Sequence, residues 1–290
     1  MSAGFHVSKD VLARIVIAAS AWVSAAVVLF LFLFLAWFCR PLLDMTTLAR
    51  LLSWDWRPFQ GSFGILSMLT GSLLLAFSSM LLAFPVGVGI CCFIHGIGPP
   101  SLARFVLRAV KLMTSVPTVV YGFVAVFVLV PLLRDVFHRG SGFSLLAAIL
   151  GLAILVLPTV VLMLHSRFLT VEPQVRLTAA ALGMTSSQKL LHLVIPASKR
   201  GFLAAAVLGL GRALGDTMIP LMLAGNAPQV PGSVFDSVRA MTAHIALVVA
   251  TDSHSLAYLS LFACGLLLFL TTTLVNIGLR MLTRNREVGS

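Results

Sequence analysis

The sequence predicts an all-α polytopic membrane protein with about six transmembrane helices. Hydrophobic residues make up 59% of the 290 residues and charged residues only 10%, whereas ordinary soluble domains carry roughly 25% charged residues. Several apolar stretches exceed the roughly 20 residues that a helix needs to cross a bilayer core of about 30 Å. Because lipid offers the backbone no hydrogen-bond partners, these stretches are expected to be helices.

The expected helices are separated by mostly short connections. They lie at residues 15–39, at about 65–94 within the uncharged stretch 58–103, and at 112–133, 140–166, 201–235 and 253–279. The first is too long for a signal-peptide core and is expected to be a retained anchor. Pro85, Pro117 and Pro158 are expected to bend their helices. Residues 235–250 could form a short helix on the outer membrane surface.

The positive charge predicts how the helices are oriented. The net charge of +11 is scattered over short loops, and no basic run interleaved with aromatic residues points to nucleic acid. With both termini in the cytoplasm, 13 of the 20 Lys and Arg residues lie on the cytoplasmic side, six lie outside, and Arg212 lies in the membrane. This asymmetry follows the positive-inside rule. The four cysteines lack metal-type spacing, so no metal site is expected.

The loop at residues 176–196 carries the most specific pattern. A helix-favouring run of small residues ends at Gly183, which suits the left-handed position after a helix end. Thr185 and Gln188 have the spacing of a capping box, and Pro196 is expected to end the helix that they begin. The sequence therefore predicts two short helices at an angle on the cytoplasmic face.

These residues resemble the cytoplasmic signature of ABC importer permeases. Thr178-Ala179, Leu182-Gly183 and Ile195-Pro196 fit that signature, except that Leu177 stands where the family usually has Glu. The resemblance implies a type I ABC importer permease fold, in which this element docks on an ATPase subunit. The residues expected to couple the two are Thr178, Ala179, Gly183, Met184, Leu191 and Pro196. An ordinary amphipathic loop is the alternative.

Arg212 and Asp216 are charged residues inside the fifth expected helix. Arg212 lies eleven residues past Gly201, roughly 16 Å into the bilayer, and Asp216 follows one turn later on the same face. The two could form a buried ion pair that fixes the register of the helix. Alternatively, Arg212 could line an anion pathway in which Asp216 favours phosphate, since phosphate keeps a proton to donate and sulfate does not. Gly211 and Gly215 would let another helix approach closely.

The same segment resembles the phosphate permeases within that family. Residues 211–217 are similar to the fifth-helix pattern G-R-A-x-G-E-T of the PstC/PstA type, with Asp216 in place of Glu. Residues 63–66, 116–122 and 225–229 also look like that branch, nearer PstC than PstA. The resemblance, from about residue 63 to the end, implies a permease that carries inorganic phosphate across the bacterial cytoplasmic membrane. It places Arg212, Asp216 and Thr217 along the pathway.

The resemblance also implies partner chains. These are two ATP-binding subunits, a second permease in a homo- or heterodimer, and a periplasmic phosphate-binding protein. The sequence contains no G-x-x-x-x-G-K-[ST] loop, so ATP hydrolysis is expected in a partner, and neither enzyme activity nor a cofactor is expected here. Residues 1–57 are expected to form an N-terminal transmembrane helix and outer loop, and residues 58–290 the permease domain.

Three alternatives stay open. The cargo could be another oxyanion, such as sulfate, molybdate or a phosphonate. The protein could be an ion-coupled secondary transporter in which Asp216 carries a proton. It could also be a membrane-embedded enzyme, but the seven histidines show no paired spacing and are expected in loops or interfaces.

Overall fold

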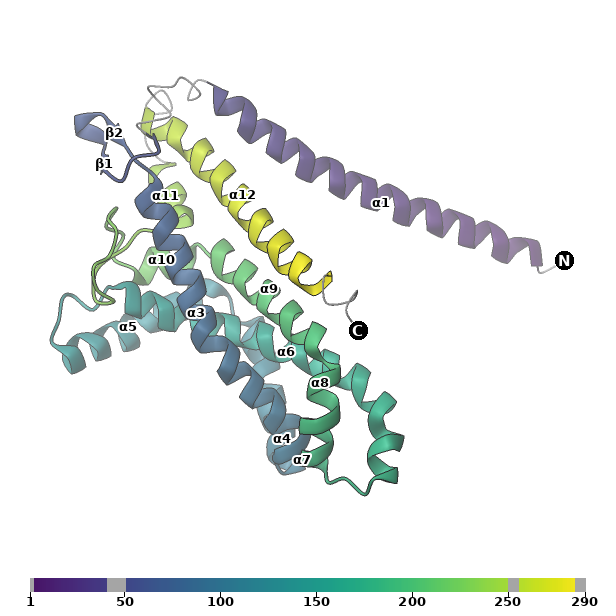
Figure 1. The fold of residues 1–290 in the computed structure, drawn as a ribbon. Coiled ribbons are helices and arrows are strands. Elements are labelled where there is room, and N and C mark those ends of the chain that lie inside the picture. The colour runs from purple at the N-terminus through teal and green to yellow at the C-terminus, as the bar shows by residue number, and fades with distance from the viewer. Residues whose placement is uncertain (1–2, 41–50, 250–255, 285–290) are drawn as a thin grey trace.

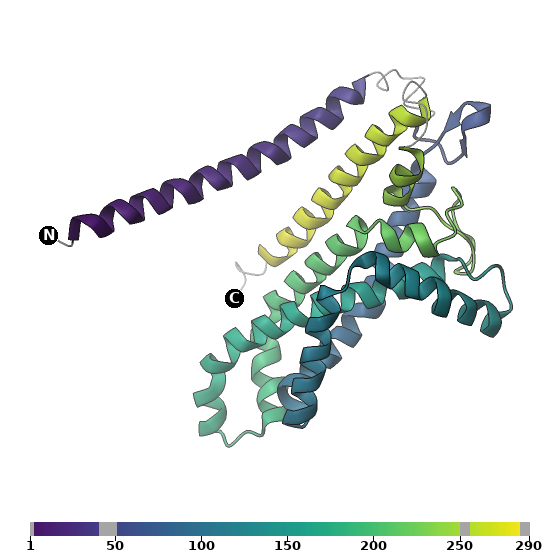
Figure 2. The same ribbon diagram turned by 180° about the vertical axis from the view of Figure 1, so that it is seen from behind.

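The computed structural model describes residues 3–40, 51–249 and 256–284 (Figures 1 and 2). Five helical stretches are long and apolar enough to cross a membrane. They lie in α1 (Ala3–Phe38), α3 (Leu66–Cys92) with its π-helical extension η3 (Phe93–Ile97), α5 (Thr118–Phe137), α6 (Leu145–Ala181) and α12 (Leu256–Arg284). These helices confirm the predicted all-α class.

The remaining candidate crossing, which is the fifth along the chain, contains a bend. After α6, the helices α7 (Ser186–Lys189), η4 (Leu190–Val194) and α8 (Ile195–Ala197) form the turn that the sequence predicts on the cytoplasmic side. The chain then bends by 70° into α9 (Lys199–Gly215). A short helix, α10 (Met218–Leu223), continues the crossing after a break. The described helices thus give five spans, or six if the bent pair Ser186–Ala197 and Lys199–Gly215 counts as one, and the prediction of about six spans is confirmed.

A small hairpin precedes α3. The strands β1 (Trp56–Arg57) and β2 (Ser62–Phe63) pair antiparallel, and η2 (Pro58–Gln60) connects them. Gly61 closes the turn with φ = 73°, a left-handed conformation that glycine adopts without steric cost. The Ile65 amide then donates to the Leu51 carbonyl at 2.9 Å, which fixes the start of α3 against the outer loop.

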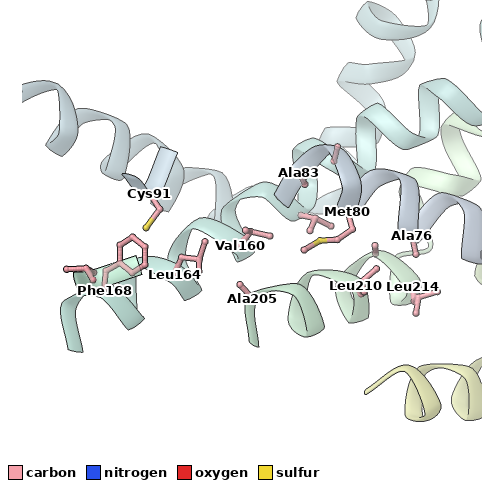
Figure 3. Packing of buried hydrophobic residues seen from close by; sticks show 14 of the residues in the cluster. Ala76, Met80, Ala83, Cys91, Val160, Leu164, Phe168, Ala205, Leu210 and Leu214 are labelled. Carbon is pink, nitrogen blue, oxygen red and sulfur yellow. The ribbon is translucent and has the colours of Figure 1, made fainter. Parts of the chain in front are cut away.

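The main core lies where α3, α6 and α9 meet. Figure 3 shows small and medium-sized side chains of the three helices facing one another, among them Ala76, Met80, Ala83, Val160, Leu210 and Leu214. At Gly209 an added Cβ would lie 2.8 Å from the Met80 sulfur and 3.2 Å from Val156, so α9 is in close contact with both α3 and α6. Such close approach through small residues is how membrane helices associate.

The third predicted span is wrong at its start. The expected helix at 112–133 is divided into α4 (Pro100–Ser115) and α5 at Val116 and Pro117, which are both extended with ψ of 126° and 141°. The ring of a proline disfavours helical geometry in the preceding residue, and here the helix ends instead of bending. The more polar α4 carries Arg104, Arg108 and Lys111.

Three further boundaries differ from those expected. The fourth span does not end at residue 166 but continues as α6 through Pro158 and Pro173 to Ala181. The fifth helix ends at Gly215 and its continuation at Leu223, well before residue 235. The helix α11 (Met241–Val248) is shorter than the predicted 235–250, and its N-terminal half is buried within the protein. Ala250 lies outside the described residues.

The N-terminal helix α1 lies apart from the rest (Figures 1 and 2). Its span, Arg14–Phe38, buries none of its residues within the chain. Its contacts with α12 are aromatic: Phe38 stacks on Phe262 at 4.7 Å, and Phe32 lies 5.7 Å from Phe269. Almost all of this helix is therefore free to contact lipid or another chain.

Candidate functional site

Arg212 projects away from the chain's own core. Leu210, Ala213 and Leu214 of α9 are buried in the core, whereas Arg212 is exposed. It shares its side of the helix with Leu208 and Gly215, which are also exposed. Arg212 is the only charged residue of α9 between Gly201 and Gly215. The fold thus leaves a cation on an open face of a membrane helix.

Asp216 does not lie on the helical face predicted for it. It follows the last residue of α9 in extended conformation (φ −74°, ψ 132°), and no ion pair joins it to Arg212 in the part of the chain that the structure describes. Its Oδ2 instead accepts the Ile219 N–H at 2.8 Å. The predicted i,i+4 pair is wrong because Asp216 caps the next helix, as aspartate commonly does at a helix start.

The break between α9 and α10 is bonded to helix α11. The Thr242 hydroxyl donates to the Asp216 carbonyl at 2.9 Å. Thr217 follows in the break and is half-buried. The structure therefore places the three predicted pathway residues together at the end of α9, with the outer helix α11 bonded to the same point.

Tyr121 belongs to this neighbourhood, although sequence reasoning gave it no role. The charge of Arg212 acts electrostatically on both Tyr121 and Asp216. The Tyr121 hydroxyl donates to the Met113 carbonyl at 2.7 Å, which connects α5 to the end of α4. An added Cβ on Gly122 would meet the Met222 sulfur at 2.5 Å, so α5 also packs directly on α10. The only signal in the sequence was the family-like segment at residues 116–122.

Gly211 and Gly215 have no close neighbour. A Cβ added at either glycine would meet no described atom within 4 Å. The helix that was expected to approach this G-x-x-x-G stripe is therefore not found in the described part of this chain.

The cytoplasmic element has the predicted caps. Gly183 is left-handed (φ 62°), and the amides of Gly183 and Met184 donate to Ala180 and Ala179 at 3.1 and 3.0 Å, which is a Schellman motif. The capping box between Thr185 and Gln188 is present in both directions. One detail is wrong: the first short helix is the end of α6, because no residue before Leu182 interrupts that helix.

The predicted coupling residues lie on two faces of this element. Ala179 is buried and Met184 half-buried, while Thr178, Gly183, Leu191 and Pro196 are exposed. Pro196 lies within α8, and the helix ends one residue later at Ala197. Three leucines are unusually open for apolar side chains: Leu177, Leu182 and Leu191 are 80%, 64% and 54% exposed. This apolar surface lacks a partner within the described residues.

Histidines that the sequence assigned to loops are brought together or buried. Nε2 of His95 in η3 lies 2.8 Å from Nδ1 of His165 in α6. Glu172 and Lys189 adjoin this pair. His244 in α11 is fully buried, with its ring 4.4 Å from that of Trp56. The predicted loop or interfacial position is wrong for the buried His244. The sequence also did not predict the contact between His95 and His165, because contacts between residues 70 apart leave no mark on local spacing.

No cluster of three or more His, Cys, Asp or Glu side chains suited to a metal ion occurs in the described ranges.

Comparison with known proteins gives consistent relatives. The family described as "Binding-protein-dependent transport system inner membrane component" matches residues 93–288. The "Phosphate transport system permease protein PstC" of Xylella fastidiosa (strain 9a5c) is 31% identical over 277 residues, which cover 88% of this chain and 85% of that protein. The protein of the same name from Pasteurella multocida is 31% identical over 240 residues, covering 76% and 75%.

Solved structures share the fold at low identity. A chain of the MetNI methionine ABC transporter in an inward-facing conformation superposes with a TM-score of 0.61 at 17% identity, covering 76% of this chain and 95% of that chain. A chain of a bacterial ABC transporter for the acidic polysaccharide alginate gives 0.58 at 15% identity, covering 97% and 99%. These two similarities concern the fold alone.

Proposed function

This chain belongs to the family of binding-protein-dependent transport system inner membrane components, and we propose that it is the permease subunit of an ABC importer for inorganic phosphate. The observation that carries the proposal is the exposed Arg212 on an otherwise uncharged stretch of a membrane helix, next to a helix break. Relatives at about 30% identity that are named for phosphate transport support the cargo.

Arg212 suits an oxyanion in the pathway. A guanidinium offers several N–H donors in a planar fork that matches two oxygens of phosphate. A charged side chain near the bilayer centre costs about 2.5–3.5 kcal/mol on insertion scales, so such residues usually serve a pathway or a partner. Because Arg212 has no ion-pair partner in the described chain, its charge is available to a passing anion.

The helix break adds polar groups at the same place. Asp216 leaves one carboxylate oxygen, Oδ1, without a hydrogen bond to the described residues. A monoprotonated phosphate can donate its proton to such an oxygen, whereas sulfate carries no proton at neutral pH. The neighbouring Thr217 and Tyr121 supply hydroxyl groups. Together these groups would favour phosphate over sulfate.

Transport would be driven by separate ATPase subunits. The exposed leucines Leu177, Leu182 and Leu191 fit a docking surface for another protein, since exposed apolar patches often mark such contacts. A groove on each ATPase would receive this element, and a second permease would face the open side of α9. A periplasmic phosphate-binding protein would deliver the cargo.

We further propose that both termini lie in the cytoplasm of a bacterium. Six crossings place the termini on one side of the membrane, and the excess of Lys and Arg residues supports the cytoplasmic side. In this orientation the α7–α8 turn faces the ATPases and α11 faces the periplasm. Residues 1–57 then form the N-terminal span and outer loop, and residues 58–290 the permease domain.

Uptake of labelled phosphate into vesicles that hold the complete transporter tests the function. Arg212→Ala should lower ATP-dependent uptake at least tenfold, because one charge-assisted hydrogen bond is worth about 1.5–3 kcal/mol. Arg212→Lys should retain part of the uptake, since it keeps the charge and loses the planar fork.

The control is Arg134→Ala, which removes an exposed arginine paired with Asp135 at 3.0 Å, on the last turn of α5. Uptake in this variant should stay within twofold of wild type. Wild-type uptake by the assembled Arg212→Ala transporter would contradict the proposed role of Arg212. Uptake of sulfate in preference to phosphate by the wild-type transporter would contradict the cargo.

A further inference from the structure

Glu172 joins the cytoplasmic turn to two membrane helices at once. Its Oε1 accepts a hydrogen bond from the Lys189 ammonium of α7, and its Oε2 lies 3.7 Å from His95 Nδ1 in η3. The other ring nitrogen of His95 lies 2.8 Å from His165 Nδ1 in α6. A chain of four polar side chains therefore links α7, α6 and the cytoplasmic end of α3.

One arrangement of protons satisfies the whole chain with both histidines neutral. If His165 carries its proton on Nδ1, it donates to His95 Nε2, and His95 then carries its own proton on Nδ1, facing Glu172. Lys189 donates to the other carboxylate oxygen. The carboxylate is thus hydrogen-bonded by Lys189 of α7 and faces the His95 ring of η3 at 3.7 Å on its other side.

The surrounding packing leaves the cluster little freedom. The Phe168 ring meets the His95 ring edge-on at 5.3 Å. The Ser187 hydroxyl donates to the Gly96 carbonyl at 3.0 Å, which joins α7 directly to η3. A Cβ on Gly96 would lie 2.7 Å from Leu190, so the turn and η3 are in direct contact. Leu190 itself is buried.

The opposite side of the same turn is open. The exposed side chains of Leu177, Leu182 and Leu191 lie on this element, while Leu190 and Val194 are buried against α3 and α6. The contacts of Glu172 therefore lie between this exposed surface and the helices α3 and α6. Those two helices contact α9 around Gly209, three residues before Arg212.

We propose that Glu172, clamped between Lys189 and His95, is a positioning residue that transmits movement of the cytoplasmic turn to α3 and α6. This inference rests on the proposed function, because it needs an ATPase to move the turn. Without the contacts of Glu172, the turn would follow the ATPase, but α3 and α6 would not follow the turn. ATP hydrolysis is then separated from phosphate uptake.

The test measures phosphate uptake and ATP hydrolysis in the same proteoliposomes. Lys189→Met and Glu172→Gln keep the size of each side chain and remove its charge. Each should lower the phosphate taken up per ATP hydrolysed at least fivefold, with the hydrolysis rate within twofold of wild type. The double swap Glu172→Lys with Lys189→Glu restores the bond between the two positions, and should recover at least half of the wild-type ratio.

The matched control again removes an ion pair elsewhere. Asp135→Asn breaks the exposed pair with Arg134 and should leave the uptake per ATP unchanged. An unchanged ratio in both single variants of the clamp would overturn the inference. So would a parallel loss of uptake and hydrolysis with a complex that dissociates on gel filtration, because the cluster would then only stabilise the fold.

A second readout does not depend on the cargo. In a background whose four cysteines are replaced by alanine, Leu208→Cys on the exposed face of α9 reports access to the pathway through labelling by a membrane-impermeant maleimide. Nucleotide should change the labelling rate at least fivefold with the clamp intact and less than twofold in Lys189→Met. If the wild-type complex takes up no phosphate but its labelling responds to nucleotide more strongly than that of Lys189→Met, the proposed cargo is refuted and the role of Glu172 is supported. A nucleotide response that is equal in both would refute the clamp.

Discussion

Asp216 has a structural contact with the backbone and a separate, proposed role in the pathway. Its Oδ2 caps α10 through the Ile219 amide, and its carbonyl accepts from Thr242. The residue therefore stabilises the break after α9, and under the proposed function it also sets the charge that an anion would meet beyond Arg212. A substitution that keeps the cap and removes the charge separates these two roles.

Asp216→Asn is that substitution, because asparagine caps helices about as well as aspartate does. We expect normal assembly and a preference for phosphate over sulfate that falls about tenfold, equivalent to roughly 1.4 kcal/mol. Competition between labelled phosphate and unlabelled sulfate in vesicles measures it. Asp216→Ala should also lower stability, by about 0.5–2 kcal/mol for the lost cap. Unchanged selectivity in Asp216→Asn, with transport intact, would refute the role of this carboxylate in selection.

His244 should make the outer part of the molecule sensitive to acid. Burial lowers the pKa of this histidine from its usual value near 6.5 to about 3, and the charge of Arg239 contributes further in the same direction. Neither ring nitrogen has a hydrogen-bond partner among the described residues. Below about pH 6.5 the unfolded state binds a proton at this histidine, whereas the folded state binds it only below about pH 3. The free energy of unfolding therefore falls as the pH drops through this range.

We therefore expect the protein in detergent to lose about 2 kcal/mol of stability between pH 7.5 and pH 5 through this residue. His244→Phe keeps an aromatic ring against Trp56 and removes both unpaired nitrogens. The variant should be more stable at pH 7.5 and lose less on acidification, as measured by thermal unfolding at both pH values. An identical pH dependence in variant and wild type would contradict the assignment.

At the scale of helices, one four-residue string has different effects at the two positions where it occurs. The string Pro-Thr-Val-Val occurs at residues 117–120 and 158–161. Pro117 is exposed and separates α4 from α5, whereas Pro158 is buried inside the continuous α6. Packing of α6 against α3 and α9 offsets the lost hydrogen bond at Pro158. Around Pro117 most side chains are exposed, so little packing supports a continuous helix.

Two glycines of α3 give a matched test of helix packing. An added Cβ would lie 2.7 Å from Val160 at Gly87 but within 4 Å of no described atom at Gly89. Gly87→Ala should therefore destabilise the protein by about 1–3 kcal/mol through overpacking. Gly89→Ala should be neutral or stabilise it by up to about 1 kcal/mol. Thermal unfolding in one detergent compares the two, and equal effects would mean that α3 and α6 do not pack as described.

At the scale of the whole molecule, the described chain leaves its functional surfaces uncovered. Arg212 faces away from the core, the leucines of the cytoplasmic turn are exposed, and the span in α1 buries none of its residues. An exposed cation in lipid is costly, so the open face of α9 is expected to meet water or another protein. These surfaces agree with a subunit that works inside a larger complex.

The purified chain alone should therefore not transport phosphate. Vesicles that contain only this chain should show no uptake above background, even with an imposed proton gradient. Addition of the second permease, the ATPases and the binding protein should make uptake depend on ATP. Uptake driven by a proton gradient in the absence of ATP would instead favour a secondary transporter in which Asp216 carries the proton.

The sequence by itself determined the class of fold and the family. Lipid forces long apolar segments into helices, so composition alone predicted about six spans. Gly183 and the pair Thr185 and Gln188 predicted their caps correctly because these interactions lie within a few residues. Residues 211–217 predicted a pathway segment through their resemblance to the phosphate permeases, and this assignment stays a prediction.

Only the tertiary structure decided which distant groups meet. His95 lies next to His165 and Glu172. Asp216 caps a helix and does not pair with Arg212. A helix ends before Pro117, whereas α6 continues through Pro158. Each outcome depends on whether neighbouring helices bury the residue and what they place beside it. Contacts between elements far apart in the chain leave no local periodicity, so the sequence could not reveal them.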